Sequence, residues 1–409
     1  RLRRFGLALI TLGGGLGWIL VTLGKDWWLG SLPLDFYSPE TFGFLGLFFV
    51  PHLALGRALL LWALLAYLRF WTGGVLPEKA LSYSVKLAGL WLLAGLVQPL
   101  SALVIGFVAV LHTGGVLIWR LLHRGALESS CGVDAGWVVR WMLLTGILPG
   151  LFVLYNAWAL SQDAYLQAWT AQNLIYSPHP LHYLVAYGLA LPFTLWGGVV
   201  QMRKDRLRGW LLVGWALALP VLAYMPVALQ RRLPEGEWVA WVTLAMVGVE
   251  SWYARRFSEG DRRRSLVLSP FLLAFLSTII LLLGAFMQSI RPALPAFRSH
   301  AEVIVFEYLA QTAQPGEVVL AAYDTGNALP AWAPLRVIIG HGPESANLAE
   351  LQPQVESFYS AAGNDIQRLE FLLRWDVRYV FWGPAERRLG GFDPRQAYYL
   401  RLMVEEGDY

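Results

Sequence analysis

Long apolar stretches separated by short polar connections dominate residues 1–290. A membrane-spanning helix needs roughly 20 mostly apolar residues, and stretches of that length recur about nine times. The pattern therefore predicts a polytopic α-helical membrane domain over residues 1–290. The predicted spans are Phe5–Gly24, Phe44–Phe70, Leu81–Gln98, Leu100–Leu122, Val138–Leu160, Leu181–Met202, Gly209–Ala228, Trp238–Ala254 and Leu266–Ile290.

After Arg291 the pattern changes to short apolar runs that alternate with helical segments. This alternation predicts an α/β domain with a largely parallel sheet over residues 291–409. The expected elements are a helix at His300–Thr312, a strand at Val318–Tyr323, a turn at Asp324–Asn327, a strand at Arg336–Gly340, helices at Leu348–Ala362 and Ile366–Arg374, and a strand at Val377–Gly383.

Ligands of parallel sheets gather at the carboxyl ends of the strands. Here those ends carry three polar groups of residues, namely Asp324 to Asn327, then His341, Gly342, Glu344 and Ser345, then Gly383, Pro384 and Glu386. His341 near Glu344 fits acid–base chemistry, and the glycines flanking His341 equally fit a sharp turn.

Composition supports a membrane protein, since 56% of residues are hydrophobic, 15% are charged and the mean hydropathy is +0.49. The basic residues indicate its orientation because cytoplasmic loops retain Lys and Arg. Basic residues of the predicted inside segments are Arg1, Arg3, Arg4, Arg69, Lys79, Arg120, Arg124, Arg140, Arg203, Lys204, Arg206, Arg208, Arg255, Arg256, Arg262, Arg263 and Arg264. Arg231 and Arg232, in a predicted outside connection, are an exception. An odd number of spans puts residues 291–409 outside the cytoplasm.

Several classes of function lack support in the sequence. The inside loops account for the net charge of +4, so nothing indicates nucleic-acid binding. The single cysteine, Cys131, can form no intramolecular disulfide. No CxxC, HExxH, GxGxxG or P-loop motif is present, so neither a structural zinc site nor a nucleotide site is indicated. No cofactor is specified, and a bound divalent metal stays open.

The chain starts with RLRR and continues directly into an apolar helix with no small-residue cleavage site. This start does not resemble a processed signal peptide. It resembles a cytoplasmic connection between two helices, so we expect residues 1–409 to be the later part of a longer protein.

The first outside connection, residues 25–42, combines carboxylates with tryptophan and tyrosine. This mixture fits an interfacial anchor or a carboxylate loop, containing Asp35 and Glu40, that faces a lipid-borne substrate. Pro51 and His52 then interrupt an apolar stretch, and Arg57 follows. An arginine at membrane depth costs on the order of 3 kcal/mol, so it needs compensation by an anion such as phosphate or by an acidic partner.

The third outside connection, Ser161–Pro180, carries Asp163, Gln172 and Asn173. Amides, an acid and aromatic rings suit a sugar-binding surface, and they also suit an ordinary interfacial loop. Asn156 near the outside end of the fifth span and Arg291 after the last span complete the candidate substrate-binding residues, with His52 and Arg57.

Four segments carry a resemblance to the GT-C superfamily of integral-membrane glycosyltransferases, the group with protein O-mannosyltransferases and lipid A aminoarabinose transferases. They are Ser38–His52 (SPETFGFLGLFFVPH), Tyr155–Asn173 (YNAWALSQDAYLQAWTAQN), and the tail motifs GNALPAWAPLRVIIGHGPES and LLRWDVRYVFWGP. The resemblance implies a polyprenyl-phosphate-linked sugar donor, inverting transfer and a soluble extracytoplasmic tail, in a bacterial cytoplasmic membrane.

The resemblance also implies a catalytic acid, commonly with a neighbouring acid, in the first extracytoplasmic loop. This chain departs from that pattern because Asp26, Asp35 and Glu40 are separated. Asp35 or Glu40 is the expected base only if Arg1 is the native start. Two hypotheses therefore stand: a transferase that uses a polyprenyl-phosphate sugar in the lipid and an unidentified acceptor, or a non-catalytic membrane subunit that binds a protein partner.

Overall fold

The computed structural model describes residues 2–122, 134–256 and 267–409. The chain divides into two compact units, the first consisting of Arg1–Ala159 and Leu174–Gly284. The second consists of Leu160–Asn173 and Ala285–Tyr409. Some positions used in the sequence analysis lie outside the described residues, namely Arg124, Cys131, Arg262, Arg263 and Arg264.

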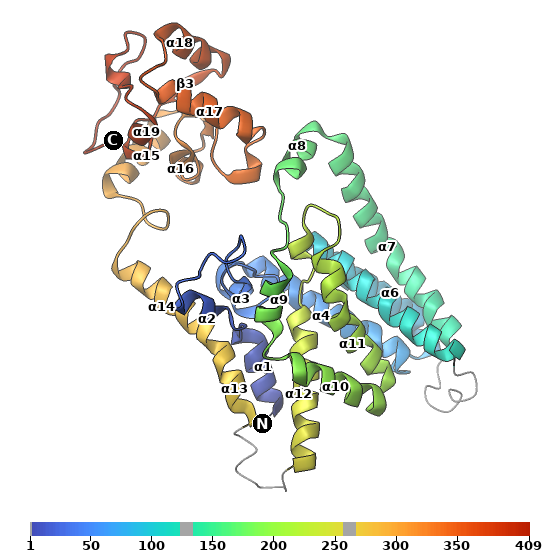
Figure 1. Cartoon of the computed structure of the whole chain (residues 1–409). Coiled ribbons are helices and arrows are strands. Elements are labelled where there is room, and N and C mark those ends of the chain that lie inside the picture. The colour runs from blue at the N-terminus through green and yellow to red at the C-terminus, as the bar shows by residue number, and fades with distance from the viewer. Residues whose placement is uncertain (1, 123–133, 257–266) are drawn as a thin grey trace. The chain divides into compact units, whose positions relative to one another are not determined.

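The first unit is a bundle of helices (Figure 1). Helices α7 and α14 continue from it into residues of the second unit. The helices are α1 (Leu2–Leu12), α2 (Gly17–Thr22), α3 (Gly43–Phe49), α4 (Pro51–Trp71), α5 (Ala80–Val97), α6 (Pro99–Leu122), α7 (Ala135–Gln162), α9 (Pro180–Tyr187), α10 (Leu191–Lys204), α11 (Arg206–Ala223), α12 (Glu237–Arg256), α13 (Ser269–Leu272) and α14 (Leu276–Ile290). Short 3₁₀ turns lie at Leu34–Phe36 (η1), Pro77–Lys79 (η2), Gln230–Arg232 (η3) and Leu273–Phe275 (η5).

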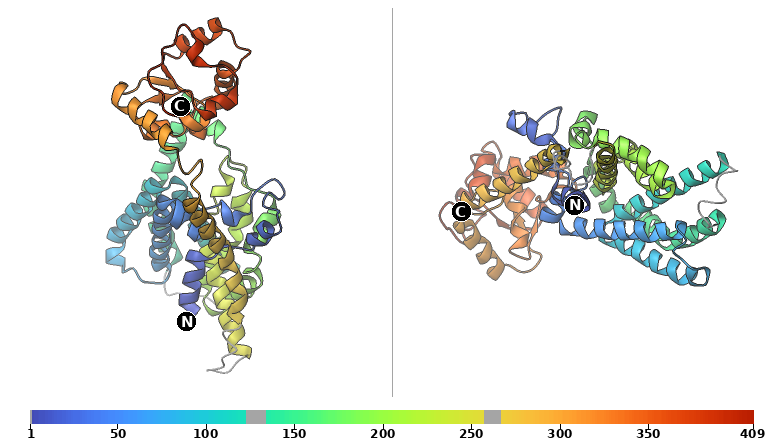
Figure 2. Two further views of the ribbon diagram at one scale, coloured as in Figure 1. Left: turned by 90° about the vertical axis from the view of Figure 1, so that its left-hand side faces the viewer. Right: turned by 90° about the horizontal axis from the view of Figure 1, so that it is seen from below.

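The first predicted span is not one continuous helix, because Gly13–Gly15 separates α1 from α2. Glycine weakens a helix by about 1 kcal/mol per residue, and three in a row favour a break. The backbone groups at this break find hydrogen-bond partners in α14, which runs beside α1 in Figures 1 and 2, and in the turn η5 before α14. The Gly14 amide donates to Ala274 O at 2.7 Å, and Thr278 Oγ1 donates to Leu12 O at 2.6 Å. Such pairing is required wherever irregular backbone is withdrawn from water.

The predicted interruption at Pro51 is confirmed. Helix α3 ends at Phe49, Val50 adopts φ −138° and ψ 74°, and α4 begins at Pro51. Proline fits the first position of a helix because its missing N–H would have no intrahelical partner there. The break puts the first turn of α4, and Arg57 after it, beside the loop that precedes α3.

Six helices in the described part of the chain are long and apolar enough to cross a membrane, or seven if α9 and α10, bent by 74°, form one span. The six are Pro51–Trp71, Pro77–Val97, Pro99–Leu122, Ala135–Gln162, Arg206–Ala223 and Ser269–Ile290. The fold is therefore that of a polytopic helical protein. The count of nine spans stays a prediction, since the broken α1–α2 segment and the more polar α12 do not meet this criterion.

Helices α10 and α12 pack so closely that only glycine fits where they cross. A Cβ atom on Gly197 would lie 1.8 Å from Leu244 O, and one on Gly248 would lie 2.2 Å from Phe193 O. Small residues at such a contact let two helix backbones approach, as in membrane helix pairs generally.

The second unit contains a three-stranded parallel sheet with strand order β2-β1-β3. This arrangement confirms the sequence prediction of a parallel sheet. The elements are α8 (Ala164–Gln172), α15 (His300–Thr312), β1 (Val318–Leu320), α16 (Tyr323–Gly326), η6 (Leu329–Ala331), β2 (Arg336–Val337), η7 (Gly342–Glu344), α17 (Leu348–Tyr359), α18 (Asp365–Arg374), β3 (Val377–Val380), α19 (Pro384–Leu389) and η8 (Pro394–Gln396).

Helices cover both faces of this sheet. Val319 packs in one core with Phe306 of α15, whereas Leu320 packs in another with Phe358 of α17. Successive strand residues point to opposite faces, so this alternation is what a strand with two covered faces requires. The predicted helix at His300–Thr312 is confirmed. The strands are shorter than predicted, since β1 ends at Leu320, β2 at Val337 and β3 at Val380, and each is followed within a few residues by a helical turn.

Candidate functional site

Arg57 holds together three segments of the first unit that are remote in sequence. Its Nε donates to Glu235 Oε1 at 2.7 Å, and its Nη2 donates to Pro39 O at 2.6 Å and to Glu40 O at 2.9 Å. The Arg57 side chain is only 10% exposed. Of the two expected ways to compensate this arginine, the acidic partner is the one observed, and the partner is Glu235.

Glu235 lies in the loop before α12 and is 1% exposed. Burial raises the pKa of its carboxyl to about 7, although the charge of Arg57 and its hydrogen bond lower it. Within the described residues, Glu235 Oε2 has no hydrogen-bond donor. Burial therefore opposes the ionisation of Glu235, whereas the nearby guanidinium group of Arg57 favours it.

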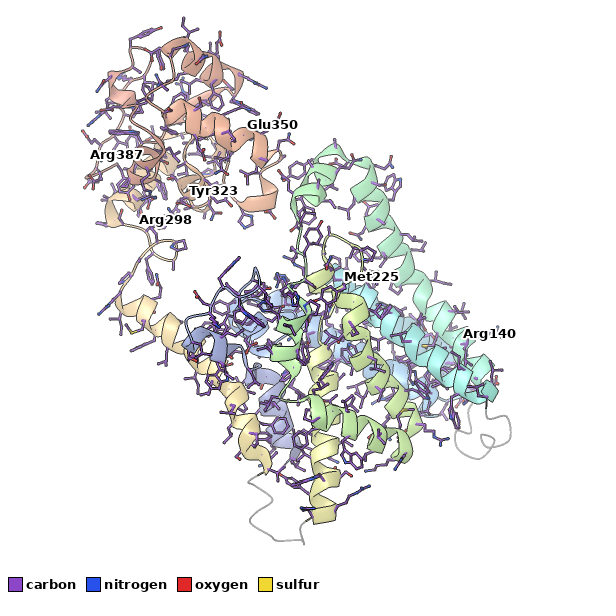
Figure 3. All side chains as sticks on the ribbon, in the orientation of Figure 1. Arg140, Met225, Arg298, Tyr323, Glu350 and Arg387 are labelled. Atoms are coloured by element: carbon purple, nitrogen blue, oxygen red, sulfur yellow. The ribbon has the colours of Figure 1, made fainter. Side chains whose placement is uncertain are left out.

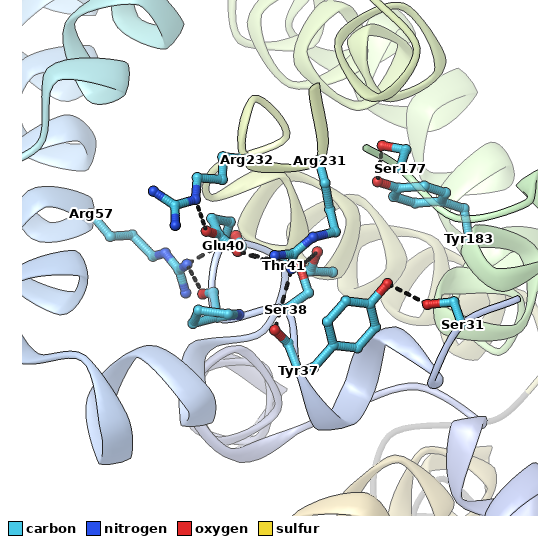
Figure 4. A network of polar contacts seen from close by, with 11 residues as sticks. Ser31, Tyr37, Ser38, Glu40, Thr41, Arg57, Ser177, Tyr183, Arg231 and Arg232 are labelled. Carbon is cyan, nitrogen blue, oxygen red and sulfur yellow. Dashed lines mark hydrogen bonds and ion pairs between the residues drawn. The ribbon is translucent and has the colours of Figure 1, made fainter. Parts of the chain in front are cut away.

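Two further arginines approach the carboxylate of Glu40, as Figure 4 shows. Arg231 Nη1 lies 3.6 Å from Glu40 Oε2, and Arg232 Nε lies 3.3 Å from Glu40 Oε1. Arg231 is anchored further, since its Nη1 donates to Tyr37 O at 3.2 Å and its guanidinium lies 4.7 Å from the Tyr37 ring centroid. Arg232 is the accessible member, with 37% of its side chain exposed.

We call Arg57, Arg231 and Arg232, with Glu40 and Glu235, the arginine cluster. It contains three permanent positive charges and two carboxyl groups, so positive charges outnumber carboxyl groups in the cluster. A surplus of fixed positive charge, partly withdrawn from water, attracts an anion. Guanidinium groups also match the geometry of phosphate oxygens.

Asp35 belongs to the same loop but serves a different set of partners. Its Oδ2 accepts hydrogen bonds from Gly15 N at 2.8 Å, Gly17 N at 3.0 Å and Ser277 Oγ at 2.7 Å. These bonds connect the break between α1 and α2 with α14. Burial raises the pKa of Asp35 to about 6, although these three donors lower it. Asp35 is therefore engaged in holding the broken helix.

Three predicted outside connections meet around the arginine cluster. The first contributes Tyr37 and Glu40, and the fourth contributes Arg231, Arg232 and Glu235. The end of the third joins them, since Ile175 N donates to Ala228 O at 2.7 Å and Tyr224 Oη donates to Pro178 O at 2.6 Å. Their convergence at one end of the bundle agrees with the alternating order of the predicted connections.

The remaining candidate residues of the first unit are separate from this cluster. His52 is exposed at the start of α4. On α7, Asn156 Nδ2 donates to Phe152 O at 2.8 Å, which is a local contact within the helix. Neither residue makes a described contact with the arginine cluster.

The other candidates belong to the second unit. Asp163 caps α8, since its Oδ1 accepts from Leu166 N at 2.9 Å, and Asn173 is buried at the end of that helix. Gln172 joins α8 to the loop before α17 through Ser345 O at 3.0 Å and Leu348 N at 2.8 Å. Arg291 is exposed after α14. The sequence-predicted residues therefore do not form one site within either unit.

The polar residues at the strand ends have structural contacts. Glu386 is fully buried and accepts from Ala322 N at 2.8 Å and Gly383 N at 2.9 Å, which closes the ends of β1 and β3. His341 Nδ1 lies 2.5 Å from Glu344 Oε2, but both side chains are exposed. This agrees with the turn interpretation of His341.

Arg231, Arg232 and Glu235 were not among the site residues predicted from the sequence. A signal for the two arginines was present, because they were the exception to the distribution of basic residues. Their proximity to Glu40 supplies a physical reason for that exception, since a basic pair on the outside requires a local counter-charge.

The described residues contain no group of three His, Cys, Asp or Glu side chains that could hold a metal ion.

No family model matches the sequence, and no curated protein matches it. Among solved structures, the chain is similar to the crystal structure of the Archaeoglobus fulgidus oligosaccharyltransferase in the apo form, with 15% sequence identity and a TM-score of 0.40. The similarity covers 79% of this chain and 45% of that chain, so this chain spans less than half of that protein's length. A similarity at this level identifies neither a family nor an activity.

Proposed function

We propose that the chain acts as a membrane glycosyltransferase whose sugar donor is linked to a lipid through phosphate, and that the arginine cluster binds this phosphate. The carrying observation is the surplus of positive charge, since three arginines, Arg57, Arg231 and Arg232, face two carboxyl groups, those of Glu40 and Glu235. Apolar helices suit a donor with a polyprenyl tail, and the partly exposed guanidinium group of Arg232 suits its headgroup.

In the proposed reaction, an acceptor hydroxyl oxygen attacks the anomeric carbon of the sugar from the face opposite the phosphate, and the configuration inverts. The bond between that carbon and the phosphate oxygen breaks, and the lipid phosphate leaves with the electron pair. A base takes the hydroxyl proton. Arg231 and Arg232 stabilise the negative charge on the leaving phosphate. The extracytoplasmic face is proposed because the basic loops lie at the other ends of the helices.

A non-catalytic membrane subunit is the second candidate, and a specific observation favours it. Asp35 holds the α1–α2 break, and the Glu40 carboxylate faces Arg231 and Arg232, so both loop acids already have structural partners. Such a subunit binds the lipid phosphate but does not release the sugar. Donor turnover by the purified protein therefore separates the two candidates.

The phosphate site is tested by measuring the affinity of a short-chain polyprenyl-phosphate sugar for the protein in lipid nanodiscs. We expect Arg232→Gln to weaken binding about 10-fold or more, because a charge-assisted hydrogen bond contributes roughly 1.5–3 kcal/mol. Arg232→Lys keeps the charge and should retain part of the affinity. The matched control is Arg140→Gln, an exposed arginine on α7 (Figure 3). Equal affinity in Arg232→Gln and Arg140→Gln contradicts the proposal.

A further inference from the structure

The backbone of Glu40 is held in position, whereas the ion pairs of its carboxylate are longer than optimal. Its backbone carbonyl accepts from Arg57 Nη2 at 2.9 Å and from Gly236 N at 3.2 Å, and the residue is 3% exposed. In contrast, the contacts of its carboxylate with Arg231 and Arg232 are 3.6 Å and 3.3 Å. Optimal charge-assisted hydrogen bonds are about 2.7–2.9 Å long. The two guanidinium groups thus retain donor capacity for another anion.

The local charge is also unbalanced. Arg231 and Arg232 carry two positive charges, whereas Glu40 supplies one negative charge. Arg57 is matched separately by Glu235. One additional negative charge beside Arg231 and Arg232 would complete the balance, and any further negative charge would be repelled by Glu40.

We infer that Glu40 is a specificity-determining residue, which makes this site select a lipid-linked sugar bearing one phosphate over the same sugar bearing a diphosphate. This inference rests on the proposed function and specifies its substrate class. A phosphodiester carries one negative charge and balances the site, whereas a diphosphate diester carries two. A buried carboxylate beside a ligand discriminates by repulsion, which is the usual way in which a site rejects a closely related competitor.

The experiment compares two probes that share one short polyprenyl chain and one sugar, joined by either a phosphate or a diphosphate. Affinities for both are measured in nanodiscs for the wild type, Glu40→Gln and Glu40→Asp. We expect the wild type to prefer the monophosphate probe. Glu40→Gln should shift the affinity ratio toward the diphosphate by about 10-fold or more, because a partly buried carboxylate repels a nearby second negative charge more strongly than it would in bulk water. Glu40→Asp keeps the charge and should keep the ratio.

The ratio is informative because a general loss of folded protein lowers both affinities together. An unchanged ratio in Glu40→Gln overturns the inference and leaves the proposed phosphate site standing. An equal shift in Glu40→Asp overturns it as well, since the effect is then one of shape and not of charge. Absence of binding of either probe to the wild type overturns the proposed function itself.

Discussion

Asp35 and Glu40 share a loop, but their surroundings give the two carboxyl groups different roles. Asp35 accepts three hydrogen bonds at the α1–α2 break, whereas Glu40 faces two arginines. At the residue scale, the chemistry of each acid is therefore set by its partners. A carboxyl group that satisfies three donors contributes to the fold, and one that lies between cations adjusts the charge of the site.

Replacing Asp35 separates its structural role from a catalytic one. Asparagine can accept the same three hydrogen bonds through its amide oxygen, so Asp35→Asn should retain the fold and donor turnover. Asp35→Ala should lower the free energy of unfolding by at least about 3 kcal/mol, because each buried donor left unpaired costs roughly 1–3 kcal/mol. Thermal unfolding in detergent and a turnover assay check both expectations. Loss of turnover in a stable Asp35→Asn would identify Asp35 as the base.

The stability of the wild type should also depend on pH through Asp35. Its pKa rises from 3.8 to about 6 in the folded protein, so folding favours the protonated acid. This contribution is fully present below about pH 4 and is lost as the pH rises through about 6, with a total of about 3 kcal/mol. Asp35→Asn should lack that pH dependence. The same slope between pH 4 and 6 in the wild type and in Asp35→Asn would contradict this expectation.

The buried pair of Arg57 and Glu235 should show strong coupling. Removing one partner leaves an uncompensated charge, so Glu235→Met should cost about 3–5 kcal/mol of unfolding free energy. Arg57→Met with Glu235→Met should cost less than the sum of the two single changes. A double-mutant cycle measures the difference, and Arg140→Gln is the exposed control. Additive effects would mean that the ion pair contributes little.

The sequence alone predicted that Arg57 requires a compensating group, but it did not identify Glu235 as that group. A buried arginine requires compensation from elementary electrostatics alone. Glu235 is remote from Arg57 in sequence, and a single sequence contains no spacing that links the two. Arg231 and Arg232 were visible as an exception in the charge pattern, but their meaning required Glu40 in three dimensions.

At the element scale, breaks in helices position the polar residues. The α1–α2 break provides the donors for Asp35, and the α3–α4 break puts Arg57 beside Pro39 and Glu40. The second break was predictable because Pro51 marks it. The first was missed because an apolar, glycine-rich stretch has the same hydropathy whether or not its helix is continuous. The tail helix at His300–Thr312 lies where the sequence pattern predicted it, and in the structure Ser299 caps it.

The close contact of α10 and α12 gives an element-scale prediction. Gly197→Ala should destabilise the protein by roughly 1–3 kcal/mol or more, because its Cβ would lie 1.8 Å from Leu244 O. The matched control is Gly214→Ala on α11, where no heavy atom lies within 4 Å of the added Cβ. That change should stabilise the protein by up to about 1 kcal/mol through helix propensity. Equal melting temperatures for the two variants would contradict the packing described here.

At the scale of the whole molecule, the second unit joins α8 to the C-terminal region. Tyr165 Oη donates to Glu344 O at 2.9 Å, and Gln172 bridges to Ser345 and Leu348. Both segments are predicted to share one face of the membrane, because each follows an odd number of spans from a cytoplasmic start. Their physical contact agrees with that prediction.

Thiol labelling tests the identity of that face. In a Cys131→Ser background, single cysteines at the exposed positions Ala164 and Glu406 should react with an impermeant reagent in intact cells. A cysteine at the exposed Lys204 should react only after permeabilisation, because its loop is basic. Labelling of Lys204→Cys alone in intact cells would reverse the orientation and the proposed extracytoplasmic reaction.

The central claim, that a lipid-linked phosphate binds at the arginine cluster, is tested most directly by photo-crosslinking. A polyprenyl-phosphate sugar with a diazirine next to the phosphate is added to the protein in nanodiscs, and the crosslinked peptides are mapped by mass spectrometry. We predict crosslinks within residues 31–42 and 224–237, and their loss in the Arg231→Gln, Arg232→Gln double variant. Crosslinks confined to other helices, and unchanged in that variant, would contradict the claim.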